Sequence, residues 1–223
     1  MRLPAIVILT CSGAFCQQAQ TPLPGEVYRP GNGVTLPVVI AKADPEYSEE
    51  ARIARLAGTV RVSSLVVAED GTVRDVRTAN SLGLGLDEKA IDAVSRWRFK
   101  PGLKDGVPIP VGVNIEINFR LTDERGVWTL SRAAFNPPEG ATRPVLTSAP
   151  YPPVDTTSGP SGSVAISFKV NPNGAAENLH IEKSSSPAAE SEVIRILRGW
   201  QFRPGTKDGE PVSVRCTLEF TSK

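Results

Sequence analysis

The sequence predicts an α+β protein of two tandem small modules, each a three-stranded antiparallel sheet with a helix packed on one face. Three observations lead to this prediction. A block of twelve residues, 97–108, recurs at 200–211 with eight identities, at a constant offset of 103. Apolar and polar residues alternate through two long stretches that end near Leu121 and Thr221, as in half-buried strands. Within each copy, apolar residues also recur at helical spacing.

Each module is expected to begin with a strand, a hairpin turn and a second strand. In the first copy an extra residue near Ser63-Ser64 breaks the alternation, which predicts a β-bulge. Turns follow at Asp70-Gly71 and Asn173-Gly174, because glycine accepts a positive φ without steric cost. The second strands are expected around Val73–Thr78 and Ala176–Ile181.

A helix and a long closing strand complete each module. Pro101 and Pro204 end the helical pattern, and a Lys-Asp-Gly turn leads into the closing strand. The alternation of the second closing strand places Cys216 on the apolar face, whereas His180 in an earlier strand faces outward. The helix positions expected to face the core are Leu86, Ala90, Val94 and Trp97, with Ala189, Val193, Leu197 and Trp200 in the second copy.

Four aromatic residues of the repeated block are expected to form the structural core: Trp97, Phe99, Trp200 and Phe202. The two tryptophans continue the apolar face of each helix, which favours burial over the alternative that they are exposed recognition residues.

Composition argues against an enzyme and against nucleic-acid binding. The net charge is +1, and no basic stretch supplies a nucleic-acid face. His180 is the only histidine, so a site of paired imidazoles is excluded. We therefore expect no catalytic residue, no metal site and no cofactor. The acidic pairs Glu49-Glu50 and Asp87-Glu88 lie in first turns of predicted helices, where the helix dipole accounts for them better than acid-base catalysis.

The N-terminus is typical of an export signal. Arg2 precedes a short apolar run, and small residues follow at Ala14 and Cys16. Residues 1–16 are therefore expected to be a signal peptide and the protein to be periplasmic, with an uncleaved inner-membrane anchor as the alternative. Cleavage would leave Cys216 as the single thiol, either a small buried hydrophobe or a link between the chains of a homodimer.

The expected organisation after the signal peptide has four parts. Residues 17–35 form a short N-terminal segment, 36–122 the first module, 123–143 a linker rich in proline and polar residues, and 144–223 a second, divergent module. The second module has prolines and glycines at 152–160, where the first has a helical pattern.

The first module resembles the C-terminal domain of TonB, the periplasmic energy transducer, over residues 36–122. The second keeps fewer matching positions, over 144–222. The resemblance rests on Pro45-Glu46-Tyr47, Gly58-Thr59-Val60, Asp70-Gly71, the helix from Leu86 to Ile91 and the block from Trp97 to Pro101, with Tyr151-Pro152, Gly162, Asn173-Gly174 and the second Trp-x-Phe-x-Pro block.

The resemblance implies a protein-binding module rather than a catalyst. Such domains engage the N-terminal peptide of an outer-membrane receptor by β-strand addition and so contribute to energy-dependent transport. It also implies inner-membrane motor proteins as partners, which the short N-terminal segment disfavours. The alternative is a non-transducing periplasmic interaction or assembly protein that retains the fold. Peptide binding is expected in the first copy, through Pro45, Tyr47, Val111, Val113, Asn114, Ile115, Glu116 and Ile117.

Overall fold

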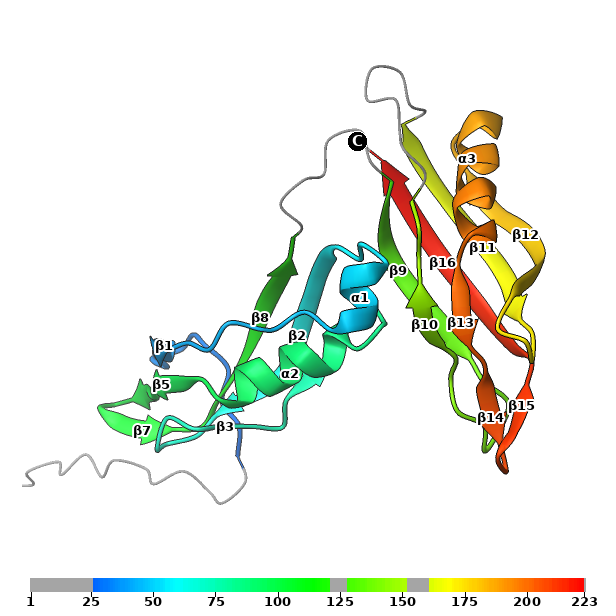
Figure 1. Cartoon of the computed structure of the whole chain (residues 1–223). Helices are drawn as coiled ribbons and strands as arrows, with labels where there is room; N and C mark the ends of the chain where they lie inside the picture. Colours follow the sequence, from blue (N-terminus) through cyan, green and yellow to red (C-terminus); the bar gives the residue numbers. More distant parts are fainter. Residues whose placement is uncertain (1–25, 121–127, 152–160, 223) are drawn as a thin grey trace, which may run out of the picture.

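A computed structural model describes residues 26–120, 128–151 and 161–222 of the chain (Figure 1). The predicted signal peptide, Leu121 and the Pro/Gly-rich stretch 152–160 lie outside the described residues. The first module runs through β1 (Val38–Ala41), α1 (Glu49–Ile53), β2 (Gly58–Val67), β3 (Val73–Arg74), β4 (Arg77–Thr78), α2 (Leu86–Ser95), β5 (Arg98–Lys100), β6 (Gly102–Lys104), β7 (Val107–Ile109) and β8 (Val111–Phe119).

One strand, β9 (Thr129–Asn136), lies between the modules. The second module comprises β10 (Val145–Ser148), β11 (Gly162–Val170), β12 (Ala176–Ser184), α3 (Pro187–Arg198), β13 (Gln201–Arg203), β14 (Gly205–Lys207), β15 (Glu210–Val212) and β16 (Val214–Ser222). Helices and sheets alternate in both modules, which confirms the α+β class.

The sheet of the first module is built around β2. This strand pairs antiparallel with β8 on one side and with β3 and β4 on the other. The predicted bulge is confirmed, because the register between β2 and β8 shifts between Val62 and Leu65. The single strand expected over Val73–Thr78 is wrong: it is split at Asp75, which has a φ of +56°. The bulge bends β2, so its partner pairs in two separate pieces, before and after the bend.

The hairpin turns fall where the sequence predicts them. Gly71 and Gly174 have φ values of +78° and +81°, which L side chains rarely adopt. A Cβ on Gly71 would also lie 1.9 Å from the carbonyl oxygen of Phe99, and one on Gly174 would lie 1.8 Å from that of Phe202. Both turns therefore require glycine for conformation and for space.

The aromatic block forms the core of each module, as predicted. Trp97 and Trp200 are 4% and 2% exposed, and Phe99 and Phe202 are each 5% exposed. The indole Nε1 of Trp97 donates to the carbonyl oxygen of Ala43 at 2.8 Å. The Nε1 of Trp200 is buried and has no partner among the described residues.

Two-stranded ribbons that the sequence did not predict extend the modules. Strand β1 pairs with β5, and β10 pairs with β13 in an equivalent register. Strands β6 and β7 form a hairpin, as do β14 and β15. The predicted Lys-Asp-Gly turns close these hairpins, with positive φ at Asp105 and Asp208 and at the glycine after each.

The sheet of the second module gains a strand from the segment expected to be a linker. Its order is β12-β11-β16-β9, so three strands match the prediction and the fourth is β9. Strand β9 was not predicted because polar and proline-rich residues surround it in the sequence. It contributes buried side chains all the same, since Leu130 is fully buried and Ala133 is 4% exposed.

Strand β9 also joins the two modules (Figure 1). Leu130 makes a parallel bridge to Leu56: its carbonyl oxygen accepts from the N–H of Ala57 at 2.9 Å, and its N–H donates to Arg55 at 3.2 Å. Further along, the N–H of Ala133 donates to the carbonyl oxygen of Leu82 at 2.7 Å. These backbone hydrogen bonds connect the second sheet directly to the first module.

Candidate functional site: an open sheet edge

The outer edge of β8 is open over most of its length. Strand β2 is its only strand partner among the described residues. The N–H and C=O of Arg61 face away from β8, because they bond to the side chain of Asn80 and the N–H of Ala79. The pair Arg61 and Glu116 is therefore not hydrogen-bonded across the ladder. It follows that the N–H and C=O of Glu116 point away from β2, toward the open edge.

The N-terminal segment confirms this direction and sets where the open edge begins. The N–H of Gly112 donates to the carbonyl oxygen of Tyr28 at 2.8 Å, and the N–H of Tyr28 donates to the carbonyl oxygen of Pro110 at 2.9 Å. Along a strand the backbone N–H groups point alternately to one edge and the other. The N–H groups of Asn114, Glu116 and Asn118 therefore point the same way as that of Gly112. Tyr28 thus covers the edge beside Val111, and the open part runs from Val113 to Phe119.

Tyr28 is held at this position by one contact at its hydroxyl and one over the face of its ring. Its hydroxyl donates to Glu26 at 2.9 Å, and the Nζ of Lys104 lies 4.9 Å from the ring centroid. The hydrogen bond to Glu26 raises the pKa of the Tyr28 phenol above its ordinary value.

The two faces beside the open edge differ in character. On the helix side, Val113 and Ile115 are half-buried and Ile117 is 3% exposed. On the opposite side, Asn114 and Glu116 are exposed, and Glu116 pairs with Arg61 at 3.1 Å. An added strand would therefore meet apolar groups on one face and polar groups on the other.

The two N-terminal residues of the expected site are placed differently. The ring of Tyr47 packs edge-on against Phe119, with centroids 5.4 Å apart, and its hydroxyl donates to Leu56 at 3.1 Å. Tyr47 therefore lies over the end of β8. Pro45 is half-buried two residues earlier, after Ala43, whose carbonyl accepts from Trp97. The structure thus brings Tyr47, but not Val111, to the open part of the edge.

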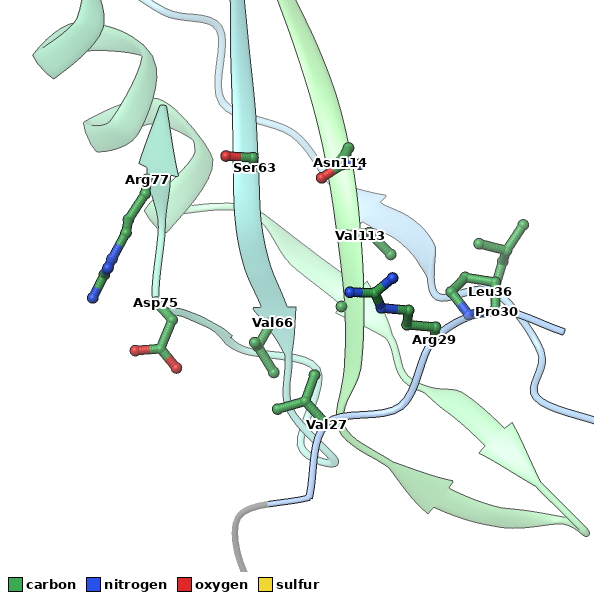
Figure 2. Close-up of a pocket in the computed structure, with 11 residues that line it drawn as sticks. Val27, Arg29, Pro30, Leu36, Ser63, Val66, Asp75, Arg77, Val113 and Asn114 are labelled. Carbon is green, nitrogen blue, oxygen red and sulfur yellow. The ribbon is translucent and has the colours of Figure 1, made fainter. Parts of the chain in front are cut away.

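A hollow of about 910 Å³ lies where the open edge begins (Figure 2). It is open to solvent and joins parts of the chain that are distant in sequence. Figure 2 shows Arg29 beside β8 near Val113 and Asn114, with Asp75 and Arg77 across the hollow. Sequence reasoning missed this hollow, because a loop, a bulge and an unpredicted N-terminal contact create it. Its lining residues are Val27, Arg29, Pro30, Leu36, Ser63, Val66, Asp75, Arg77, Gly112, Val113 and Asn114.

The corresponding edge in the second module is closed. Strand β16 is the counterpart of β8, and β9 pairs with it antiparallel from Arg215 to Thr221. The Ser131 hydroxyl donates to the carbonyl of Glu219 at 2.9 Å, and Arg132 reaches the carboxylate of Glu219 at 3.4 Å. The backbone groups that stay open in the first module are thus occupied within the chain in the second.

Asp87, Glu50 and Cys216 have structural roles. The carboxylate of Asp87 accepts from the N–H groups of Leu82 and Gly83, and Glu50 pairs with Arg143 at 2.7 Å. Burial raises the pKa of the Cys216 thiol to about 12. The described residues contain no acidic, histidine or cysteine cluster that could hold a metal ion, and none of their helices is long and apolar enough to span a membrane.

Both modules match one protein family in sequence. The family model described as Gram-negative bacterial TonB protein C-terminal matches residues 43–121 and 147–221. Protein TonB of Vibrio cholerae serotype O1 is 31% identical over 84 residues, which are 38% of this chain and 34% of that protein. The chain thus spans about a third of that relative's length.

This chain is also similar to the solution NMR structure of the Pseudomonas aeruginosa TonB CTD, with 20% sequence identity and a TM-score of 0.31. The match covers 39% of this chain and 88% of the Pseudomonas chain. The family model itself covers more than half of the sequence, in two segments. The chain therefore belongs to the family of Gram-negative bacterial TonB C-terminal domains.

Proposed function

We propose that the first module binds a short extended peptide by adding it as a strand to the open edge of β8. The observation that carries this proposal is the contrast between the two modules. The backbone groups of Asn114 and Glu116 point to an edge that no described strand occupies, whereas the same groups of β16 bond to β9. An edge with free N–H and C=O groups is a template for another strand. Affinity in this mode comes largely from main-chain hydrogen bonds.

The peptide we propose is the N-terminal segment of an outer-membrane receptor, engaged in the periplasm. Family membership supports this partner, and strand addition is a mode in which one edge accepts many sequences. Through it the protein would contribute to energy-dependent transport across the outer membrane.

Each residue of the site has a distinct part in the proposal. Asn114 and Glu116 supply the outward N–H groups, while Val113, Ile115 and Ile117 supply the apolar face beneath alternate peptide side chains. Tyr47 borders the end of the edge, next to Phe119, and Pro45 precedes it by two residues. Val111 anchors the start of β8 in the core, where it is fully buried.

The experiment compares proline and alanine at one outward position. Glu116→Pro removes an N–H that points to the open edge and leaves the ladder with β2 intact. Glu116→Ala removes the same carboxylate but keeps that N–H. Calorimetric titration with synthetic peptides from receptor N-termini should give at least about fivefold weaker binding for the proline variant, the effect of one lost hydrogen bond. The alanine variant should bind like the wild type.

Asn114→Pro and Asn114→Ala form a second matched pair at the next outward position. Circular dichroism and denaturant melts should show that all four variants remain folded. Undiminished binding in both folded proline variants would rule out the β8 edge. Equal loss in the alanine variants would assign affinity to the side chains instead of the backbone.

A further inference from the structure

Strand β1 exposes apolar side chains that the first module does not cover. Ile40 is 68% exposed, Leu36 62%, Val38 58% and Val39 43%, and these four residues are named here the β1 surface. Among the described residues, these four and Val27, at 46%, are the large apolar residues with exposed side chains. Grouped exposed apolar residues on a soluble protein mark an interaction site.

The second module contains the counterpart of the β1 surface. Val39 pairs with Phe99, and Leu146 of β10 pairs with Phe202 in the same register. The residues before the two strands also match. The Oγ1 of Thr35 accepts from the N–H of Leu103, and the N–H of Thr35 donates to the carbonyl oxygen of Leu103. Thr142 makes the same two hydrogen bonds with Thr206. The repeat therefore shows what an equivalent surface binds.

In the second module helix α1 of the first covers the middle of this surface, at Leu146, whereas Thr147, the counterpart of Ile40, is exposed. Leu146 is only 2% exposed, and its N–H donates to the carboxylate of Glu50, in the first turn of α1, at 3.1 Å. Arg143 holds the same carboxylate through two nitrogens, at 2.7 and 2.9 Å. Ala51 and Ala54 of this helical segment are fully buried.

The backbone of β1 is oriented to make the same contact. The N–H of Phe99 donates to Gly71, away from β1, so Val39 and Phe99 form a non-hydrogen-bonded pair. The N–H of Val39 therefore points to the outer side of β1. That is the direction in which Leu146 donates to Glu50.

The charges around β1 favour an acidic occupant over a second copy of this chain. Lys42 follows the strand, and Arg98 and Lys100 lie on its partner β5, all of them exposed. Pairing two β1 strands would bring these cations together, which is unfavourable. Leu36 replaces Arg143, so the contact at that position is apolar in the first module.

We propose that the β1 surface docks a short helix of a partner protein. A carboxylate in the first turn of that helix accepts from the N–H of Val39, and the small and apolar side chains of the helix cover Val38 and Val39, the counterparts of Val145 and Leu146. Helix α1 on β10 is the template for the contact. The proposal concerns a surface other than the β8 edge and does not depend on peptide binding there.

The template supplies the probe for the experiment. A peptide with the sequence of residues 47–57, locked as a helix by a side-chain bridge, is titrated into the full-length protein and followed by NMR. The expected result is a saturable shift of the amide signals of Val38, Val39 and Ile40. A probe with the Glu50→Gln change should bind about fivefold more weakly, since the carboxylate is the acceptor.

Two protein variants locate the binding. Val39→Asp should weaken probe binding at least about tenfold, whereas Val27→Asp, an apolar-to-acidic change outside the β1 surface, should not. Glu116→Pro should leave probe binding unchanged, which separates this test from that of the proposed function. Absence of saturable shifts, or equal binding to Val39→Asp, would overturn the proposal.

Two further outcomes would assign the β1 surface to another occupant and so also overturn the proposal. A mass that doubles with concentration in sedimentation, and reverts in Ile40→Asp, would identify a second copy of the chain. Binding to phosphatidylglycerol vesicles that Ile40→Asp abolishes would identify a lipid surface.

Discussion

Replacing each core tryptophan by phenylalanine should have unequal effects in the two modules. Trp97 and Trp200 are almost equally buried, and their centroids lie 6.2 and 6.3 Å from Phe99 and Phe202. The buried indole area is therefore similar at both positions, and the further ring contacts of Trp200, with Tyr151 and Phe220, are ones that a phenylalanine ring can also make. Trp97→Phe also removes the hydrogen bond to Ala43, a loss of about 1 kcal/mol.

At the second position the sign of the polar contribution reverses. The Nε1 of Trp200 is buried without a partner among the described residues, so Trp200→Phe removes an unsatisfied donor. Relief of that desolvation contributes about 1 kcal/mol of stability and offsets part of the lost packing. Trp97→Phe should therefore be more destabilising than Trp200→Phe by about 2 kcal/mol.

Denaturant unfolding of the full chain, followed by circular dichroism, measures this difference. The slope of free energy against denaturant should be equal for both variants, so that midpoints compare stability alone. A larger loss of stability for Trp200→Phe than for Trp97→Phe would refute the reasoning from hydrogen bonding.

Three further predictions concern the thiol, the module contact and the N-terminus. Because burial raises the pKa of the Cys216 thiol to about 12, the native thiol should stay unreactive to maleimide at pH 8 and become reactive in denaturant. The free energy of unfolding should fall as pH rises above about 9, because the thiol ionises there in the unfolded chain but not in the folded one. A native thiol that reacts as fast as the unfolded one would contradict its burial. Glu50→Gln should destabilise the chain by about 1–2 kcal/mol in denaturant melts, because it weakens the hydrogen bonds from Arg143 and Leu146. The control Glu49→Gln, which changes an exposed ion pair with Arg52, should cost less than about 0.5 kcal/mol. Equal costs would mean that the contact between α1 and β10 contributes no stability. The mature protein should begin near Gln17, which the intact mass of protein from a periplasmic extract would show. A chain that retains Met1 and sediments with the inner membrane would instead support an uncleaved anchor.

The sequence predicts the fold within each repeat because local patterns decide it. The break at Ser63-Ser64 marks the bulge, and the glycines at 71 and 174 mark turns with positive φ. Trp97 and Trp200 lie at helical spacing and are buried as expected. Each of these features depends on residues close together in the chain.

The features that distinguish the two modules depend on distant contacts, and the sequence does not predict them. Strand β9 has a weak alternation and becomes a strand because β16 and Leu56 offer it partners. Tyr28 covers the start of β8 through backbone bonds that have no sequence signature. The site residues on β8 were predicted together, but which of their edges is open follows only from these contacts.

Among the described residues, the edge of β8 is open for strand addition, whereas β9 closes the corresponding edge of β16. The most direct test follows the backbone amides of both strands by NMR while a receptor N-terminal peptide is titrated into the full-length protein. We expect shifts and new exchange protection at Asn114, Glu116 and Asn118, and unchanged signals at Thr217, Glu219 and Thr221. Shifts confined to β16, together with loss of protection in β9, would contradict it.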